Sequence, residues 1–316
     1  MNYPRRKHSQ KGMTLVEIMV ALTISMVLMA GVLQIFISNQ MNYRVQEATS
    51  RLQENGRFAA HLITKEIRMA DFWGCVGSAS TVIDHLNPPV FPATNPSTPG
   101  DGGVIGTDDD GLNGSDSITL QGAFGSGLGV TGHNVNAASF SVSTVNHSLN
   151  NFDIVLASDC QKADLFEVTN SNPGTNTTVV GNTGAVASGP GNLTKPGMSY
   201  ANGSAMIYAV RKIIYSIKAG ASGEPALFRS VNGNDVEMVE GVEDMQILYG
   251  EDTDADQTAN RYVEADLAGL VMDNVVSVRL TLTLRTIEDN IAGAAANGDR
   301  RIRRTYTTTV TIRNRV

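Results

Sequence analysis

The fold is decided near the start of the chain, where residues 11–37 read KGMTLVEIMVALTISMVLMAGVLQIFI. From Met13 onward this stretch is apolar except for a few Thr, Ser, Gln and Glu side chains. A helix of about 20 mainly apolar residues spans the hydrocarbon core of a bilayer, so the sequence predicts a transmembrane helix over residues 13–37. The polar residues that follow offer no small-residue cleavage site, so this is not an ordinary secretory signal and we expect the segment to stay attached.

The residues before the apolar stretch predict its orientation. Arg5, Arg6, Lys7 and Lys11 form a basic cluster on its N-terminal side. Such clusters stay in the cytoplasm, so the rest of the chain is expected on the other side of the membrane.

Glu17 is the unusual residue of the predicted transmembrane segment. A carboxylate at this depth costs roughly 2.5–3.5 kcal/mol on insertion scales, so it normally has a partner or a function. Two interpretations are open from composition alone. Either the segment is a simple anchor with Glu17 near the headgroups, or Glu17 pairs with a positive charge inside the membrane.

The string from Lys11 to Glu17 resembles the cleavage signal of type IV prepilins and pseudopilins. The resemblance implies that a prepilin peptidase cuts between Gly12 and Met13 and that the new amine of Met13 is methylated. Phe is commoner than Met at that position. It further implies that Glu17 pairs with the N-terminal amine of a neighbouring subunit, since opposite charges desolvated together attract strongly and set the register between helices.

An amphipathic helix is predicted to continue the membrane segment, giving one long helix over residues 13–72. Gly31 and Gly56 each weaken it by about 1 kcal/mol relative to alanine, and we interpret them as sites of bending or local melting during assembly. An apolar stripe on the second half needs a body to cover it. Its members recur at three- and four-residue spacings: Val45, Ala48, Leu52, Ala59, Ile63, Ile67 and Ala70.

Residues 73–316 are predicted to form a β-rich body, so that residues 1–12 are a cleaved leader, 13–72 a helix and 73–316 a globular domain. Apolar and polar residues alternate over Val276–Ile287 and more weakly over Arg304–Arg313, as in an antiparallel hairpin with one buried face. The fold class is therefore α+β and pilin-like, with the long helix packed on an antiparallel β-sheet that carries loop-rich insertions over 77–200. We expect the stretch from Asn170 to Gly203 to be a surface excursion.

Six short stretches resemble the PilW-type minor pilins, which are related to the J-type minor pseudopilins of type II secretion. They are residues 51–58 (RLQENGRF), 68–70 (RMA), 72–75 (FWGC), 158–160 (SDC) and 240–250 (EGVEDMQILYG) and the Arg313-Asn314 pair.

This resemblance implies a minor pilin that takes part in type IV pilus assembly, in a priming or tip complex. Its expected partners are the inner membrane, the prepilin peptidase, other minor pilins and the major pilin, and a tip adhesin is a further candidate. It would lie first in the bacterial inner membrane with its body in the periplasm, and later in the pilus at the cell surface. A J-like pseudopilin and a non-polymerising, membrane-anchored binding domain are the alternatives.

Cys75 and Cys160 are the two cysteines of the chain. In a body outside the cytoplasm a disulfide between them is the default expectation. Two buried free thiols are the alternative, because buried cysteine is common.

Asp252, Asp254 and Asp256 form a candidate calcium loop, because hard cations take several oxygen ligands from a tight turn. The pattern departs from an EF-hand, since Gln257 stands where that motif has glycine. A solvated acidic turn is the favoured alternative, and no other cofactor is expected. Residues 108–110 with Asn113 and Asp116 are a weaker second candidate.

Composition and motifs argue against two other classes of function. The net charge is −7 and no long basic stripe occurs outside the termini, so we expect no nucleic-acid binding. No nucleophile elbow, His-Glu-x-x-His pair or phosphate-binding glycine loop occurs, so no catalytic residues and no enzyme activity are expected.

Overall fold

The computed structural model describes residues 12–74, 82–87, 103–184, 189–197, 199–201, 203–291 and 298–316. Two compact units make up the chain. The first comprises Met1–Arg51 and Glu288–Ile302, and the second comprises Leu52–Ile287 and Arg303–Val316.

One helix, α1 (Leu15–Met69), runs for 55 residues, about 80 Å at the usual rise per residue. It contains no proline, and its first half is rich in good helix formers such as Leu, Met and Ala. Residues 12–44 are exposed on all sides of the helix, and this part is long and apolar enough to cross a membrane. The helix ends where Asp71 adopts a positive φ of 62°. The predicted long helix is therefore confirmed.

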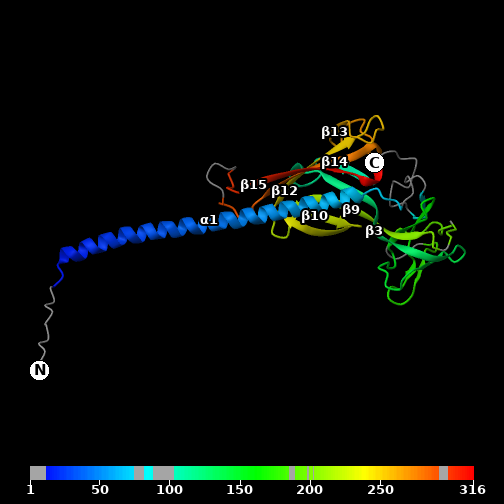
Figure 1. Ribbon diagram of the computed structural model, residues 1–316, viewed down its shortest axis with the longest axis horizontal. Helices are drawn as coiled ribbons and strands as arrows, with labels where there is room; N and C mark the ends of the chain where they lie inside the picture. The colour runs from blue at the N-terminus through cyan, green and yellow to red at the C-terminus, as the bar shows by residue number, and fades with distance from the viewer. Residues whose placement is uncertain are drawn as a thin grey trace, which may run out of the picture. The chain divides into compact units, whose positions relative to one another are not determined.

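The second half of α1 buries Leu52, Ala59, Ile63 and Ile67 of the predicted apolar stripe within the second unit, and Ala70, directly after the helix, is buried as well. Leu52 is 3% exposed, and Ala59, Ile63 and Ile67 are fully buried. Figure 1 shows this half of the helix (light blue) running beside β9 (Met206–Ala219) and β10 (Pro225–Val231). This half of the helix therefore packs on the β-rich body, as the three- and four-residue spacings of its apolar residues predicted.

The larger sheet has 11 strands and is organised around β9, which pairs antiparallel with β3, β5 and β10. Its pairings are antiparallel except for the parallel pair of β1 with β6. Besides β9 and β10 its strands are β1 (Val82–Asp84), β2 (Val104–Thr107), β3 (Ser117–Asn134), β4 (Ser139–Val142), β5 (Ile154–Ser158), β6 (Ala163–Glu167), β7 (Asn170–Ser171), β8 (Thr178–Val180) and β11 (Asn234–Glu240).

The smaller sheet has four strands in the order β13-β12-β14-β15, all paired antiparallel. The predicted final hairpin is confirmed, because Leu280 of β14 lies opposite Thr308 of β15. Alternate residues of β14 are fully buried, which matches its apolar pattern. The strands are β12 (Val242–Glu251), β13 (Arg261–Val263), β14 (Val275–Arg285) and β15 (Arg303–Thr311).

The predicted surface excursion over residues 170–203 is wrong in part. This stretch contains β7 and β8, and Val179 and Tyr200 are buried in a hydrophobic cluster with Phe140 and Phe166. The buried Asn192 side chain exchanges two hydrogen bonds of 2.8 Å with the backbone of Glu167. The Asn192 side chain thus satisfies the backbone groups of Glu167 in the way that a neighbouring strand would. This explains how a stretch rich in Asn and Gly can be buried.

Candidate processing and assembly site

The start of α1 is set by a local capping pattern. The backbone N–H of Glu17 donates to the Thr14 hydroxyl at 3.3 Å and to the Thr14 carbonyl at 3.1 Å. Thr14 and Glu17 have the Thr-x-x-Glu spacing of a capping box, which fixes the first helical turn. Gly12 and Met13 precede the helix and are exposed, and no atom lies within 4 Å of a Cβ built at Gly12. The predicted scissile bond between them is therefore accessible, whereas residues 1–11 lie outside the described part.

Glu17 lies on the first turn of α1 and is exposed among apolar neighbours that are exposed as well. Within the described residues no Lys, Arg or His pairs with it. A carboxylate in lipid needs a partner. The predicted pairing of Glu17 with the N-terminal amine of a neighbouring subunit stays a prediction.

A second glutamate of α1, Glu66, docks the helix on the larger sheet. The Arg229 guanidinium of β10 donates to both Glu66 carboxylate oxygens, with the shortest contact at 2.7 Å. The Tyr215 hydroxyl of β9 donates to Glu66 at 2.6 Å. The hydrogen bonds from Glu66 raise the pKa of Arg229, and burial raises the pKa of Tyr215. The sequence did not reveal this cluster, because its one local signal is an acidic residue between two stripe positions, Ile63 and Ile67.

Gly56 fits the helix against the smaller sheet. It is buried, and a Cβ at this position would lie 2.2 Å from the aromatic ring of Tyr306 in β15. The Tyr306 hydroxyl also lies 3.5 Å from the Leu52 carbonyl oxygen. Gly56 therefore provides space for an aromatic ring, whereas the bending or local melting predicted there stays a prediction.

The Arg313-Asn314 pair lies where the helix ends. The Asn314 side-chain amide donates to the carbonyl oxygens of Met69 and Ala70, at 3.3 Å and 2.8 Å. Arg315 forms an ion pair of 2.6 Å with Asp71. The last residues of the chain thus satisfy carbonyl groups that a helix C-terminus leaves unpaired.

Asp252, Asp254 and Asp256 have carboxylate oxygens within 4.8 Å of one another, so the structure brings the predicted calcium residues together. The Asp252 carboxylate, however, already accepts four backbone N–H groups, those of residues 254–257. These bonds close the turn without an ion and hold the pKa of Asp252 below its usual range, against the opposing effect of desolvation. Calcium binding at this turn stays a prediction.

The predicted disulfide also stays a prediction, because Cys75 lies outside the described residues. Cys160 lies two residues after the end of β5 and has a positive φ of 69°. The Ser158 hydroxyl donates to the Gly74 carbonyl oxygen at 2.7 Å, so Gly74 lies against the end of β5.

His85, the residue after β1, lies in a buried network. Its ring nitrogens lie 2.6 Å from the Thr194 hydroxyl and 2.6 Å from the carboxylate of Asp164 in β6. The Tyr200 hydroxyl donates to the other Asp164 oxygen at 3.1 Å. Both nitrogens of the imidazole are thus engaged, and the network joins three chain segments around a fully buried carboxylate.

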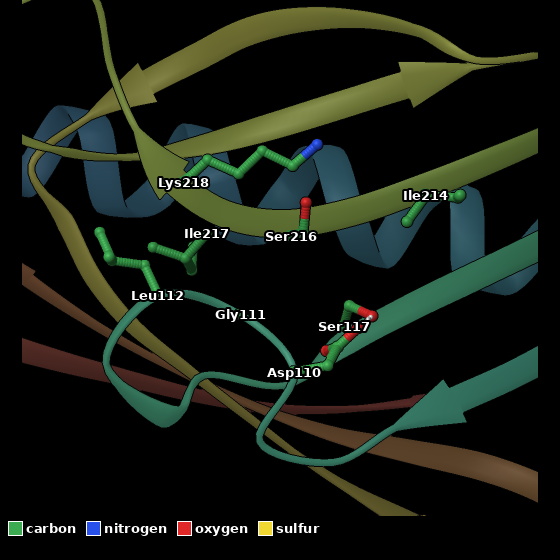
Figure 2. Close-up of a pocket in the computed structure, with 8 residues that line it drawn as sticks. All are labelled: Asp110, Gly111, Leu112, Ser117, Ile214, Ser216, Ile217 and Lys218. Atoms are coloured by element: carbon green, nitrogen blue, oxygen red, sulfur yellow. Dashed lines mark hydrogen bonds between the residues drawn. The ribbon is translucent and has the colours of Figure 1, made fainter.

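A pocket of about 420 Å³ lies between β3, β9 and the loop before β3. Figure 2 shows Asp110 and Ser117 next to each other in this pocket and Lys218 on the β9 side. Both charged groups are already engaged: Asp110 accepts from Ser117 at 2.8 Å, and Lys218 pairs with Asp235 at 2.6 Å.

Two family models match the chain. The prokaryotic N-terminal methylation motif matches residues 7–33, and type IV pilus-assembly protein W matches residues 214–314. The second match includes Tyr215, Arg229 and Tyr306, which contact α1. No curated protein and no solved structure matches the chain.

Together, the methylation motif and the apolar helix define a class: a single-pass, membrane-anchored pilin with its body outside. Within that class the two matches support a type IV pilus minor pilin of the PilW type, processed and methylated at its N-terminus.

Proposed function

We propose that this minor pilin acts in a priming complex at or near the tip of the pilus. In this proposal it contacts other minor pilins and the major pilin through the first half of α1, after prepilin peptidase has cut at Gly12. The docked second half of α1 holds the β-rich body, which the fibre presents outside the cell.

Glu17 is the observation that carries the proposal. It is a carboxylate on an exposed apolar helix, and no cation among the described residues pairs with it. A simple anchor gains nothing from such a residue, because the carboxylate opposes insertion. In an assembling subunit, by contrast, an ion pair between Glu17 and the free N-terminal amine of a neighbour attracts the two chains and fixes the register between their helices.

Cross-linking to partner pilins in native membranes tests this proposal. Glu17→Gln keeps the Thr-x-x-Gln capping pattern but removes the charge, so it separates capping from charge pairing. We expect Glu17→Gln and Glu17→Ala to be inserted and cleaved normally, and both to lose partner cross-links and surface fibres. Full activity of Glu17→Gln would show that Glu17 only caps the helix.

A Gly12→Val variant provides the matched control, since blocked cleavage leaves no free amine at Met13. If this variant and both Glu17 variants keep wild-type cross-links and fibres, the helix is only an anchor. Immunogold labelling tests the tip position separately: labels spread along the fibre would contradict it. Normal pili with a loss of secreted proteins in a deletion strain would favour the J-like pseudopilin.

A further inference from the structure

The loop between β2 and β3 carries a buried carboxylate, Asp116, which is only 3% exposed. It accepts the backbone N–H of Asp109 at 3.1 Å and that of Ile247 in β12 at 2.6 Å. Burial, and then the adjacent Asp108 carboxyl group, raise the pKa of Asp116 to about 6. The loop of one sheet is thus fixed on a strand of the other through an acidic side chain.

Two groups of carboxylates meet at Asp108. Its oxygen atoms lie within 4.8 Å of those of Asp109 and Asp116, and likewise of those of Glu264 and Asp266, which follow β13. Among the described residues no basic side chain forms an ion pair with any of these five. Like charges in such proximity repel unless a proton or a cation lies between them.

Tyr249 of β12 gives a second, independent observation. Its side chain is 1% exposed, and its hydroxyl has no hydrogen-bond partner among the described residues. The hydroxyl lies against Gly106 of β2, two residues before Asp108. Burial raises the pKa of Tyr249, and the carboxylates of Asp116, Asp108 and Asp110 add to this effect. Buried hydroxyls are normally paired, which leaves an oxygen here in need of a partner.

We propose that Asp108, Asp109 and Asp116 bind a calcium ion, with the Tyr249 hydroxyl as a neutral oxygen beside them. Oxygen atoms within 4.8 Å of one another can all lie about 2.4 Å from one ion, and calcium takes 6–8 oxygen ligands. Glu264 and Asp266 offer further carboxylates at Asp108. The bound ion would join the β2–β3 loop to β12 and to the segment after β13, and so link the two sheets.

The cluster differs from both sets of residues considered in the sequence. Asp110 does not belong to it, because its carboxylate bonds to Ser117 in the pocket of Figure 2. At the other acidic turn, four backbone N–H groups already occupy the Asp252 carboxylate. The Asp252 turn therefore serves as an internal control for calcium binding at Asp108.

Calcium titration of the full-length protein in detergent, after removal of divalent ions with EDTA, tests the proposal. We expect CaCl2 at millimolar concentration to raise the Tm by about 5 °C, since an ion that binds only the folded state stabilises it by mass action. Asp108→Asn should abolish this shift, and its calcium-free Tm should be no lower than that of the wild type because repulsion is relieved. Tyr249→Phe should weaken calcium affinity severalfold without lowering the calcium-free Tm.

Asp254→Asn is the matched control and should keep the full calcium shift. The proposal is overturned if the wild type shows no shift, if MgCl2 gives an equal shift, or if Asp108→Asn responds as the wild type does. Loss of the shift in Asp254→Asn alone would place the ion at the other turn.

Discussion

Two glutamates on one helix show how a residue's surroundings decide its role. Glu17 lies on an exposed apolar surface without a cation among the described residues, whereas Glu66 is held by Arg229 and Tyr215. The first is available to another molecule, and the second is committed to the protein's own fold.

Replacing Glu66 with Gln is expected to lower the free energy of unfolding by about 2–3 kcal/mol, because Arg229 is left partly buried without its counter-charge. Thermal or urea unfolding of the full chain measures this. Glu47→Gln is the control, since Glu47 pairs with Arg51 on the exposed surface, where such pairs contribute less than about 1 kcal/mol. Equal effects of the two variants would contradict a docking role for Glu66.

The two cysteines are expected to be joined. The hydrogen bond between Ser158 and Gly74 brings Gly74 close to the turn at Cys160. Closing a loop of this length would contribute about 4–5 kcal/mol on the chain-entropy model. Peptide mapping without reducing agent should recover a linked Cys75–Cys160 pair. Two thiols that alkylate freely in native protein would refute it.

At the scale of elements, the sequence predicted what depends on local spacing. The apolar stripe of α1 and the alternating pattern of β14 could both be predicted, because each pattern repeats within a single element. The contacts of Gly56 and Glu66 were not, since their partners lie in β15, β9 and β10, far along the chain.

Strand β11 (Asn234–Glu240) was missed for another reason. Among the described strands it pairs only with β10, so it forms an exposed edge of the sheet. It carries acidic residues, which protect edge strands from pairing with other chains. Because acidic residues have low β-propensity, a sequence of this composition is not recognised as a strand.

Gly56→Ala is expected to destabilise the protein although alanine favours helices by about 1 kcal/mol. The added methyl group would lie 2.2 Å from the Tyr306 ring, and overpacking typically costs about 1–3 kcal/mol. Urea unfolding should show a net loss of stability, and a second substitution, Tyr306→Ala, should remove the part due to the clash. Gly31→Ala is the control, because nothing lies within 4 Å of a Cβ at Gly31. Similar results for both glycines would show that helix propensity alone matters.

At the scale of the molecule, one helix serves two environments, because its first half is exposed and apolar and its second half is docked on β-sheets. Protein extracted from membranes should therefore begin at Met13 and carry one methyl group on its amine. Intact-mass measurement checks this, and Gly12→Val should retain residues 1–12. A mature N-terminus at Met1, or one beyond Ile37, would contradict the assignment.

The contact of Asn314 with the end of α1 has a consequence for the order of synthesis. The two partners are separated by 244 residues, so the ribosome completes the helix long before its cap exists. Until Asn314 has been synthesised, the carbonyl groups of Met69 and Ala70 lack these two hydrogen bonds. The end of α1 therefore gains its cap only after β15, the last strand of the smaller sheet, has been translated.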